Sequence, residues 1–312
     1  MSSSAASADA DVLVVCGPTA AGKSAVAMAL AERQPVTIIS ADSRQVYRGF
    51  DVGTAKPSAR ERAQVPHLGI DVVDPTVRYS AAQWAESADR WIHEARSAGR
   101  VPLVVGGTGF YLRALFEPLF EEPVLDPAER DRVEHELAPL SLIQLRDLCA
   151  TADPARAHLG RAQLIRALVV HRLSGRPLSE WHQHAARPAR RSARYLVVDP
   201  ADALGERIGK RVDAFLDAGW VDEVAKLRET VPMDAPAWNA SGYGVILELL
   251  AGSVTAQQAR ERVVIETRQY AKRQRTWFRH QLPGDRTTRL DPLAADAAER
   301  AGRWMNEGGE GT

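Results

Sequence analysis

The sequence has few cysteines, no long hydrophobic run and no excess of charge of either sign. Among its 312 residues only Cys16 and Cys149 are cysteines, and they form no C-x-x-C pair, so neither a disulfide framework nor a zinc site is expected. Both are predicted to be small core residues. No window approaches the roughly 18 consecutive apolar residues that a membrane span requires. The first ten residues, MSSSAASADA, lack the basic and apolar regions of a secretion signal. We therefore expect a cytoplasmic protein with no membrane partner and a disordered start at residues 1–10.

The formal net charge is zero, because Lys and Arg together number 40 and so do Asp and Glu. This balance disfavours indiscriminate binding to polyanions. The charge is unevenly distributed, however, since residues 154–195 are rich in arginine with Glu180 as their single acid, whereas residues 117–136 are mostly acidic. A basic segment of this kind is usually a solvated face, so by itself it leaves contact with nucleic acid open.

Short apolar runs alternate with helical segments along the first part of the chain. The pattern predicts helices at residues 23–33 and 81–97 and a set of buried strands at residues 11–16, 36–40, 69–73, 101–105 and 195–198. Alternation of this type is typical of a parallel sheet covered by helices. The expected fold class is therefore α/β, a parallel sheet flanked by helices like that of the P-loop NTPases.

Strand signals disappear between residues 120 and 194, where helical segments are broken at Pro139, Pro154 and Pro188. This stretch lies between two predicted strands of the sheet. It is therefore predicted to be an all-helical domain inserted into a catalytic core that consists of residues 11–119 and 195–290. The core ends in further helices after residue 201, and residues 291–312 carry little signal and are expected to form a C-terminal tail.

The stretch VCGPTAAGKS, residues 15–24, fits the phosphate-binding pattern G-x-x-x-x-G-K-[ST] between a predicted strand and a predicted helix. In such a loop the backbone N–H groups and the helix start face an oligophosphate, the lysine reaches the outer phosphates and the hydroxyl can ligate Mg²⁺. The predicted anion-binding residues, which we call the phosphate loop, are Gly17, Pro18, Thr19, Ala20, Ala21, Gly22, Lys23 and Ser24, with Ser24 as the candidate Mg²⁺ ligand.

The carboxylate that completes the magnesium site of an NTPase is missing. The strand at residues 101–105 is followed by Gly106, Gly107, Thr108 and Gly109, which disfavours hydrolysis of a nucleoside triphosphate. A carboxylate instead follows the second strand, at Asp42. Because ligands bind at the carboxyl ends of parallel strands, the phosphate loop, Asp42 and Thr108 can line one cleft. Taken singly, Asp42 could equally be a helix N-cap and the glycines a tight turn.

Near the C-terminus, TRQYAKRQRTWFR combines basic and aromatic residues. In a helix its cations recur at i, i+4, i+7 and i+11 and form one stripe, composed of Arg268, Lys272, Arg275 and Arg279. Aromatic residues lie among them. This arrangement suits a single-stranded or looped RNA, but it fits equally well an amphipathic helix with a solvated face.

Four stretches occur in one order and spacing: GPTAAGKS, SADSRQVYRGFDVGTAKP, VPLVVGGTGFYLRAL and TRQYAKRQRTWFR. Together they closely resemble the bacterial tRNA dimethylallyltransferases, also called tRNA isopentenyltransferases or IPP transferases, from about residue 11 to residue 279. The resemblance implies transfer of a dimethylallyl group from dimethylallyl diphosphate to N-6 of the adenosine 3′-adjacent to the anticodon. The substrates would be tRNAs that read codons beginning with U, and diphosphate would be released. It also implies Mg²⁺ as cofactor and a monomeric enzyme.

The resemblance further implies individual roles. Lys23 and Arg211 would stabilise the departing diphosphate, Asp42 would accept the amine proton, and Thr108 would hydrogen-bond the base. The inserted domain would contact the anticodon stem-loop of the tRNA. The implied tRNA-contacting residues are Asp42, Ser43, Arg44, Gln45, Thr108, Ala162, Gln163, Leu164, Ile165, Arg166, Asn239, Ala240, Ser241, Gly242, Tyr243, Gly244, Lys272, Arg273, Gln274, Arg275, Thr276, Trp277, Phe278 and Arg279.

The chain departs from the family pattern at Gln163 and Val169, where Arg and Glu are expected, and at Gly244, where a basic residue is usual. These departures concern the contact with tRNA rather than the transfer chemistry. Three alternatives remain open on the residues alone: an adenylate isopentenyltransferase that prenylates a free nucleotide, a small-molecule kinase that uses ATP at the phosphate loop, and an RNA-binding module with a vestigial loop.

Overall fold

The computed structural model describes residues 11–117, 119–120, 123–184, 186–187, 189 and 191–307. The chain divides into two compact units, Met1–Phe116 with Arg190–Thr312 (unit 1) and Glu117–Ala189 (unit 2), which are treated separately below. The predicted disordered start lies outside the described residues. Within the described part of the chain, no helix is both long enough and apolar enough to cross a membrane.

Unit 1 is built on a six-stranded sheet in the order β3-β2-β4-β1-β7-β8, and every neighbouring pair is parallel. The expected α/β fold of the P-loop type is thereby confirmed. The central strand β1 pairs with β4 on one side and β7 on the other, with Cys16 opposite both Gly106 and Val197. The strands are β1 (Val12–Cys16), β2 (Val36–Ser40), β3 (His67–Leu68), β4 (Val101–Gly106), β7 (Ala193–Val198) and β8 (Thr287–Leu290).

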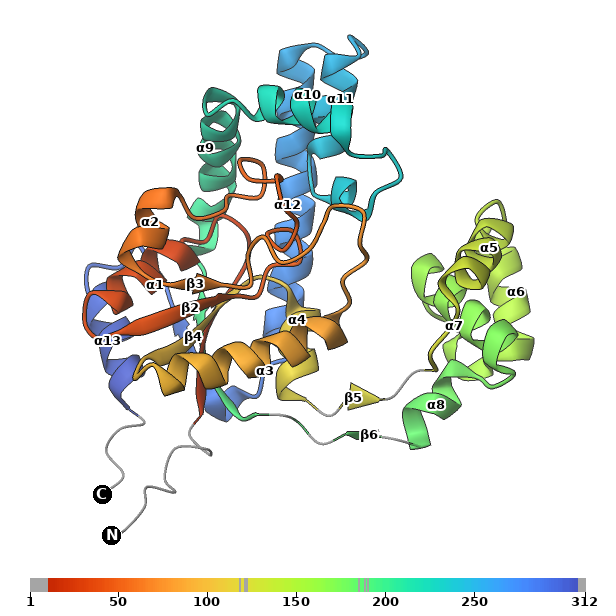
Figure 1. Ribbon diagram of the computed structural model, residues 1–312, viewed down its shortest axis with the longest axis horizontal. Helices are drawn as coiled ribbons and strands as arrows, with labels where there is room; N and C mark the ends of the chain where they lie inside the picture. Colours follow the sequence, from red (N-terminus) through yellow and green to blue (C-terminus); the bar gives the residue numbers. More distant parts are fainter. Residues whose placement is uncertain are drawn as a thin grey trace. The chain divides into compact units, whose positions relative to one another are not determined.

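Helices cover both faces of this sheet (Figure 1). One face packs against α1 and α13, whereas α3 packs on β2 and β4 and stacks its Trp84 ring on Tyr111 of α4, with the ring centroids 4.7 Å apart. The long helix α12 contacts α9, α11 and α4. The helices of unit 1 are α1 (Lys23–Ala31), α2 (Ala59–Gln64), α3 (Ala81–Ser97), α4 (Gly109–Phe116), α9 (Leu204–Asp217), α10 (Trp220–Thr230), α11 (Tyr243–Leu250), α12 (Ala256–His280) and α13 (Ala297–Asn306).

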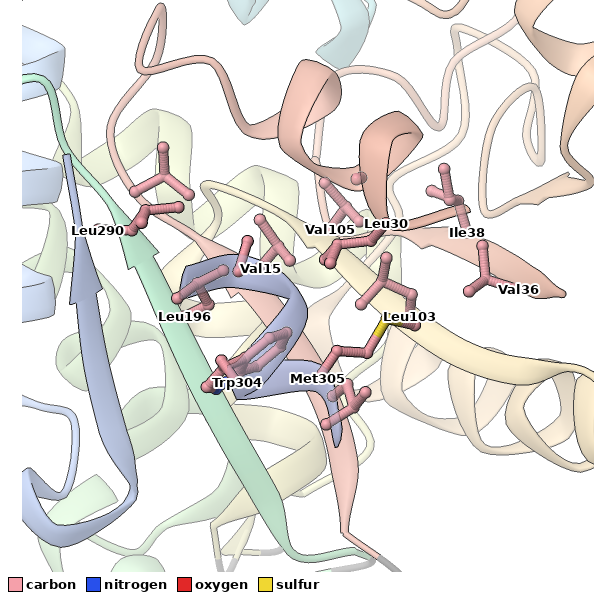
Figure 2. Packing of buried hydrophobic residues seen from close by; sticks show 14 of the residues in the cluster. Val15, Leu30, Val36, Ile38, Leu103, Val105, Leu196, Leu290, Trp304 and Met305 are labelled. Atoms are coloured by element: carbon pink, nitrogen blue, oxygen red, sulfur yellow. The ribbon is translucent and has the colours of Figure 1, made fainter. Parts of the chain in front are cut away.

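The core between the sheet and the α1–α13 layer follows from strand alternation. Val15, Leu103 and Leu196 project to the same face because side chains of neighbouring strands in register share a face. Figure 2 shows them meeting Leu30 of α1 and the ring of Trp304 from α13. Both cysteines are buried, as predicted.

Three features differ from the sequence-based expectations. The predicted strand at residues 69–73 is wrong: Asp71 has a φ of 55°, and the backbone N–H groups of Asp71 and Val72 donate to Gln45 and Val46 rather than to a strand of the sheet. The short edge strand β3 lies just before it. Strand β8 and helix α13 were not anticipated. The expected tail at 291–312 therefore contains a helix whose Trp304 is buried in the core.

Unit 2 is helical, as expected, except for a ribbon of two antiparallel two-residue strands, β5 (Leu119–Phe120) and β6 (Ala186–Arg187), near its two ends. The strand that follows it, β7, begins at Ala193, two residues before the predicted start. Unit 2 has a core of its own, which includes Leu137, Cys149 and Leu164. Its helices are α5 (Pro127–Leu137), α6 (Leu142–Ala152), α7 (Arg161–Ser174) and α8 (Leu178–His184).

Candidate active site

A cavity of about 650 Å³ opens at the carboxyl ends of the strands of unit 1. The phosphate loop after β1, the segment after β2 and the glycine turn after β4 all contribute to it. These three strands are neighbours in the sheet, in the order β2-β4-β1, so their connections emerge side by side. Helices α9 and α12 supply the remaining polar wall. The sequence-based prediction of one shared cleft is therefore confirmed for the phosphate loop and Asp42.

The phosphate loop turns tightly between β1 and α1. Gly17 and Gly22 have positive φ angles, and the Lys23 ammonium donates to the Pro18 carbonyl oxygen at 2.7 Å. Helix α1 begins at Lys23, so its first N–H groups are not used within the helix and point toward the loop. The Ser24 hydroxyl lies on an exposed residue that lines the cavity. The loop thus combines free N–H donors, a helix start and an ammonium group in one place.

Helix α9 adds cations to the same cavity. Arg207, Lys210 and Arg211 line it, and the Arg207 guanidinium also donates to the carbonyl oxygen of Ala20 at 2.9 Å. Burial and, to a lesser extent, the charge of Arg211 lower the pKa of Lys23 to about 8, whereas Asp42 opposes the shift. Burial also lowers the pKa of Arg211, again opposed by Asp42. Two cations therefore face one carboxylate, which is an environment that favours binding of an anion.

Asp42 lines the cavity, and its Oδ1 accepts the backbone N–H of Arg44 at 2.8 Å. Thr108 does not line the cavity. Its hydroxyl oxygen instead accepts the N–H of Ser43 at 3.0 Å, and its own N–H donates to Ala41 at 3.1 Å. The two segments are thereby held together next to the carboxylate. Asp42 and Thr108 are therefore neighbours, as predicted, and of the two only Asp42 lines the cavity.

The segment between β2 and α2 is a self-bonded loop. Gln45 accepts a hydrogen bond from Ser40 at 2.9 Å and donates to the carbonyl oxygens of Thr54 and Ala55. The Lys56 ammonium, on a side chain only 2% exposed, bridges Asp51 and Asp71 at 2.6 and 2.5 Å. Gln45, which was expected to contact tRNA, lines the cavity, and its amide also holds this loop together.

Aromatic residues form the far wall of the cavity. Phe215 and Trp220 line it, and their rings lie 5.7 Å apart. Tyr243 packs behind Trp220, and its hydroxyl donates to Glu223, whose other oxygen accepts the N–H groups of Asp51 and Val52. The cations lie at the phosphate loop and on α9, which we call the cationic end, and the aromatic wall adjoins them, since the Arg211 guanidinium lies over the Phe215 ring, 5.0 Å from its centroid.

Helix α12 does not present the predicted stripe as one cationic face. Arg275 pairs with Asp199, with Nε to Oδ2 at 2.9 Å, and also donates to the carbonyl oxygen of Ala201. Gln274 and Phe278 are buried, although both were expected to contact tRNA. The residues that α12 exposes between positions 267 and 279 are Arg268, Gln269, Lys272, Arg273, Thr276 and Arg279.

The remaining expected tRNA-contacting residues of unit 1 differ in accessibility. Ala240 and Ser241 line the cavity, and Asn239 is exposed. Tyr243 is buried and Gly242 packs against Trp220, so neither is accessible to RNA. Gly244 is exposed, and a side chain there would meet nothing within 4 Å. The position that departs from the family pattern therefore has room for the usual basic residue.

In unit 2, several arginines are paired with acids, either close in sequence or, for Arg172, on another helix. Arg172 contacts Glu136 at 3.3 Å, Arg176 contacts Glu180 at 2.8 Å, and the Arg156 guanidinium lies 3.5 Å from Asp153. This pairing reduces the positive potential that the linear sequence suggests. Leu164 is fully buried, so it is not the expected tRNA contact, and Val169 is also in the core, where an apolar residue is favoured. The other expected contacts there are Ala162, Gln163 and Arg166, all exposed, and the half-buried Ile165.

Sequence reasoning missed Arg207, Lys210 and the structural use of Gln274. Arg207 could have been found, because it stands four residues before Arg211 and so lies on the same helical face. Phe110 was also missed. It follows the glycine turn, is 64% exposed, and its neighbour Gly109 packs against the ring of Trp277.

Comparison with known proteins gives a consistent result. The family model described as IPP transferase matches residues 45–281, and the model described as isopentenyl transferase matches residues 10–71. The tRNA dimethylallyltransferase of Alkalilimnicola ehrlichii is 44% identical and covers 95% of this chain and 96% of its own length. That of Halorhodospira halophila is 43% identical, covering 92% and 95%.

Solved structures are similar over the same extent. The full-length tRNA isopentenylpyrophosphate transferase of Bacillus halodurans superposes with a TM-score of 0.68 at 31% identity, covering 96% of this chain and 97% of that one. A eukaryotic dimethylallyltransferase described as acting on tRNA gives a TM-score of 0.79 at 25% identity, covering 96% and 79%.

The lowered pKa of Lys23 predicts how anion binding depends on pH. Below pH 8 the ammonium is charged before and after an anion binds, so Lys23 adds no pH dependence. Above pH 8 the free protein has lost this proton and must regain it, so affinity for inorganic diphosphate falls, by up to tenfold per pH unit. Calorimetry between pH 7 and 10 measures the effect.

Lys23→Arg is the matched control, because a guanidinium keeps its charge throughout this range and any remaining slope belongs to the diphosphate itself. Parallel curves for the two proteins would contradict a titrating Lys23.

Proposed function

The chain belongs to the IPP transferase family, and we propose that it is a tRNA dimethylallyltransferase. In this proposal it transfers the dimethylallyl group of dimethylallyl diphosphate to N-6 of the adenosine 3′-adjacent to the anticodon in tRNAs that read codons beginning with U. One observation carries the proposal: a single cavity joins a cationic phosphate loop, an apolar wall and the carboxylate of Asp42. The family expectation of a cytoplasmic monomer completes it.

The donor's diphosphate would occupy the cationic end. The N–H groups at the start of α1, Lys23, Arg207 and Arg211 would meet the negative charge that grows on the leaving group. The dimethylallyl chain would lie against Phe215 and Trp220, whose rings keep water from the allylic carbon. No acidic residue follows β4, where an NTPase has the carboxylate of its magnesium site. This agrees with a diphosphate that leaves as an intact group instead of being hydrolysed.

Mg²⁺ fits this site as a companion of the diphosphate. The described residues contain no group of three or more His, Cys, Asp or Glu side chains that could bind a metal ion. Mg²⁺ commonly keeps several waters and takes one or two protein ligands plus substrate phosphates, and the Ser24 hydroxyl in the cavity suits that requirement. When bound, the ion would neutralise part of the charge on the leaving diphosphate.

The acceptor amine needs a base, because its lone pair is delocalised into the adenine ring. Asp42 lies in the cavity with Oδ1 held by the Arg44 N–H, and among the described residues Oδ2 has no hydrogen-bond partner, so Oδ2 would take the proton. A carbon–nitrogen bond forms as the bond from the allylic carbon to the diphosphate oxygen breaks, and the amine proton passes to Asp42. Thr108 would act indirectly, by holding Ser43 and Tyr270 through hydrogen bonds. Alternatively, after a small movement, it would hydrogen-bond the base itself.

Within unit 1, the RNA surface in this proposal consists of the exposed part of α12. Lys272, Arg273 and Arg279 would contact phosphates, and the exposed ring of Phe110 beside the site suits stacking on an unpaired base. Extrusion of the target adenosine costs about a few kcal/mol, which these contacts must offset. Ser241, which lines the cavity, and Asn239, which is exposed, would contact the extruded nucleotide.

A transfer assay tests the proposed function directly. With Mg²⁺ and labelled dimethylallyl diphosphate, we expect label in an anticodon stem-loop that carries adenosine at the target position and none in free AMP. Label in AMP would instead indicate an adenylate isopentenyltransferase. Incorporation into neither acceptor would refute both, and consumption of ATP would indicate a kinase.

Asp42→Asn should reduce kcat by about 10²- to 10⁴-fold, the usual contribution of a general base. The amide oxygen can still accept the Arg44 N–H, so the local fold should persist. Because one negative charge near Lys23 and Arg211 is removed, binding of inorganic diphosphate should stay equal or become tighter. Single-turnover kinetics and calorimetry measure the two effects.

Asp74→Asn is the matched control, since Asp74 caps an exposed turn at Thr76 and should leave kcat unchanged. Loss of RNA and diphosphate binding in parallel with kcat would mean that Asp42 is structural.

Ala replacements on α12 should separate phosphate contacts from structural pairs. Lys272→Ala combined with Arg273→Ala should weaken binding of the stem-loop and make the slope of log K against log salt shallower, by about 0.7 to 0.9 per lost phosphate contact. Arg275→Ala should leave the slope nearly unchanged, because Arg275 is paired with Asp199. Equal slopes for the double variant and the wild type would remove this part of α12 from the RNA interface.

A further inference from the structure

One buried side chain connects two backbone segments of the cavity. Gln274 of α12 is only 7% exposed; its Oε1 accepts the N–H of Thr19 at 2.8 Å, and its Nε2 donates to the carbonyl oxygen of Gly107 at 2.8 Å. Thr19 belongs to the phosphate loop after β1, and Gly107 belongs to the turn after β4. A single planar amide therefore ties the anion-binding loop to the neighbouring strand.

The peptide group between Pro18 and Thr19 is held at both ends. Gln274 binds its N–H, and the Lys23 ammonium binds its carbonyl oxygen at 2.7 Å. Because the N–H and C=O of a peptide group are coplanar and point in opposite directions, fixing the N–H also fixes the direction of the Pro18 carbonyl. The orientation imposed by Gln274 thus determines where the Lys23 ammonium rests in the cavity.

We propose that Gln274 is the positioning residue of the diphosphate site. It holds the phosphate loop in the conformation that directs Lys23 and the N–H groups at the start of α1 toward the anion. The inference rests on the proposed function only in taking that anion to be the donor's diphosphate. Gln274 lines the cavity, and in this proposal it acts through Thr19 and Lys23.

The chemistry of the side chain suits this task. One partner is a donor and the other an acceptor, and a neutral amide serves both in one rigid plane, whereas an ionised carboxylate can only accept. The neighbouring Lys272 and Arg273 are exposed on the same helix. Helix α12 therefore holds the phosphate loop with its buried side and exposes cations on its other side.

The test measures binding of inorganic diphosphate with Mg²⁺ by calorimetry, and thermal unfolding serves as a check on folding. Gln274→Met keeps the shape and removes both hydrogen bonds, so the Kd should rise about ten- to hundred-fold, as expected for the loss of two bonds to buried partners. Gln269→Met, at an exposed position of the same helix, is the matched control and should stay within about twofold of wild type.

Gln274→Glu adds a readout that a merely structural role would not give. Ionised, the introduced carboxylate accepts from Thr19 but repels the Gly107 oxygen; protonated, it can both accept and donate. Its affinity for diphosphate relative to wild type should therefore recover as the pH falls. This comparison also decides the question if Gln274→Met fails to fold.

Two results would overturn the positioning role alone. One is a wild-type affinity for diphosphate in Gln274→Met. The other is a ratio of diphosphate affinities, Gln274→Glu to wild type, that does not change with pH. Failure of the wild-type protein itself to bind diphosphate would overturn the proposed function and this role with it. Weakened binding in Gln274→Met with an unchanged control and a pH-dependent ratio in Gln274→Glu would establish the role.

Discussion

The close approach of backbone segments at the carboxyl edge of the sheet is the constraint on which the site depends. A side chain at Gly17 would overlap the carbonyl oxygen of Val198, and one at Gly106 would overlap that of Ala41. Both overlaps are with backbone, which cannot move aside as a flexible side chain can. Glycine at these two positions therefore lets the phosphate loop approach the end of β7, and lets the end of β4 approach the segment that carries Asp42. The phosphate loop and the carboxylate line one cavity at this edge.

Two cations and one carboxylate set the electrostatics of the cavity. Lys23 and Arg211 both have lowered pKa values, chiefly through burial, and Asp42 opposes the shift in each. The same carboxylate thus moderates the repulsion between the two cations. The apolar wall of Phe215 and Trp220 lies in the same cavity. An anion that carries an apolar chain suits this cavity, because cations and aromatic rings lie next to each other in it.

Several of the cations that suggest RNA binding in the sequence form ion pairs within the folded protein. Arg172 and Arg176 pair with Glu136 and Glu180 inside unit 2, and Arg275 pairs with Asp199 in unit 1. Exposed pairs of this kind add little stability, but they remove cations from a potential RNA surface. Lys272 and Arg273 remain exposed. A count of cations along the sequence therefore overstates the basic surface wherever the folded chain pairs those cations with acids.

The sequence by itself determined the fold class, the phosphate loop, the location of Asp42 and the family, because these depend on local patterns: buried strands followed by glycine turns, and motifs in fixed order. It also predicted helix Ala81–Ser97 and strand Val36–Ser40 with their observed bounds. Only the tertiary structure decided which cations stay free, that Leu164 and Phe278 are buried, and that Gln274 binds Thr19 across 255 positions of the chain. Such contacts join residues far apart in sequence, so no local pattern encodes them.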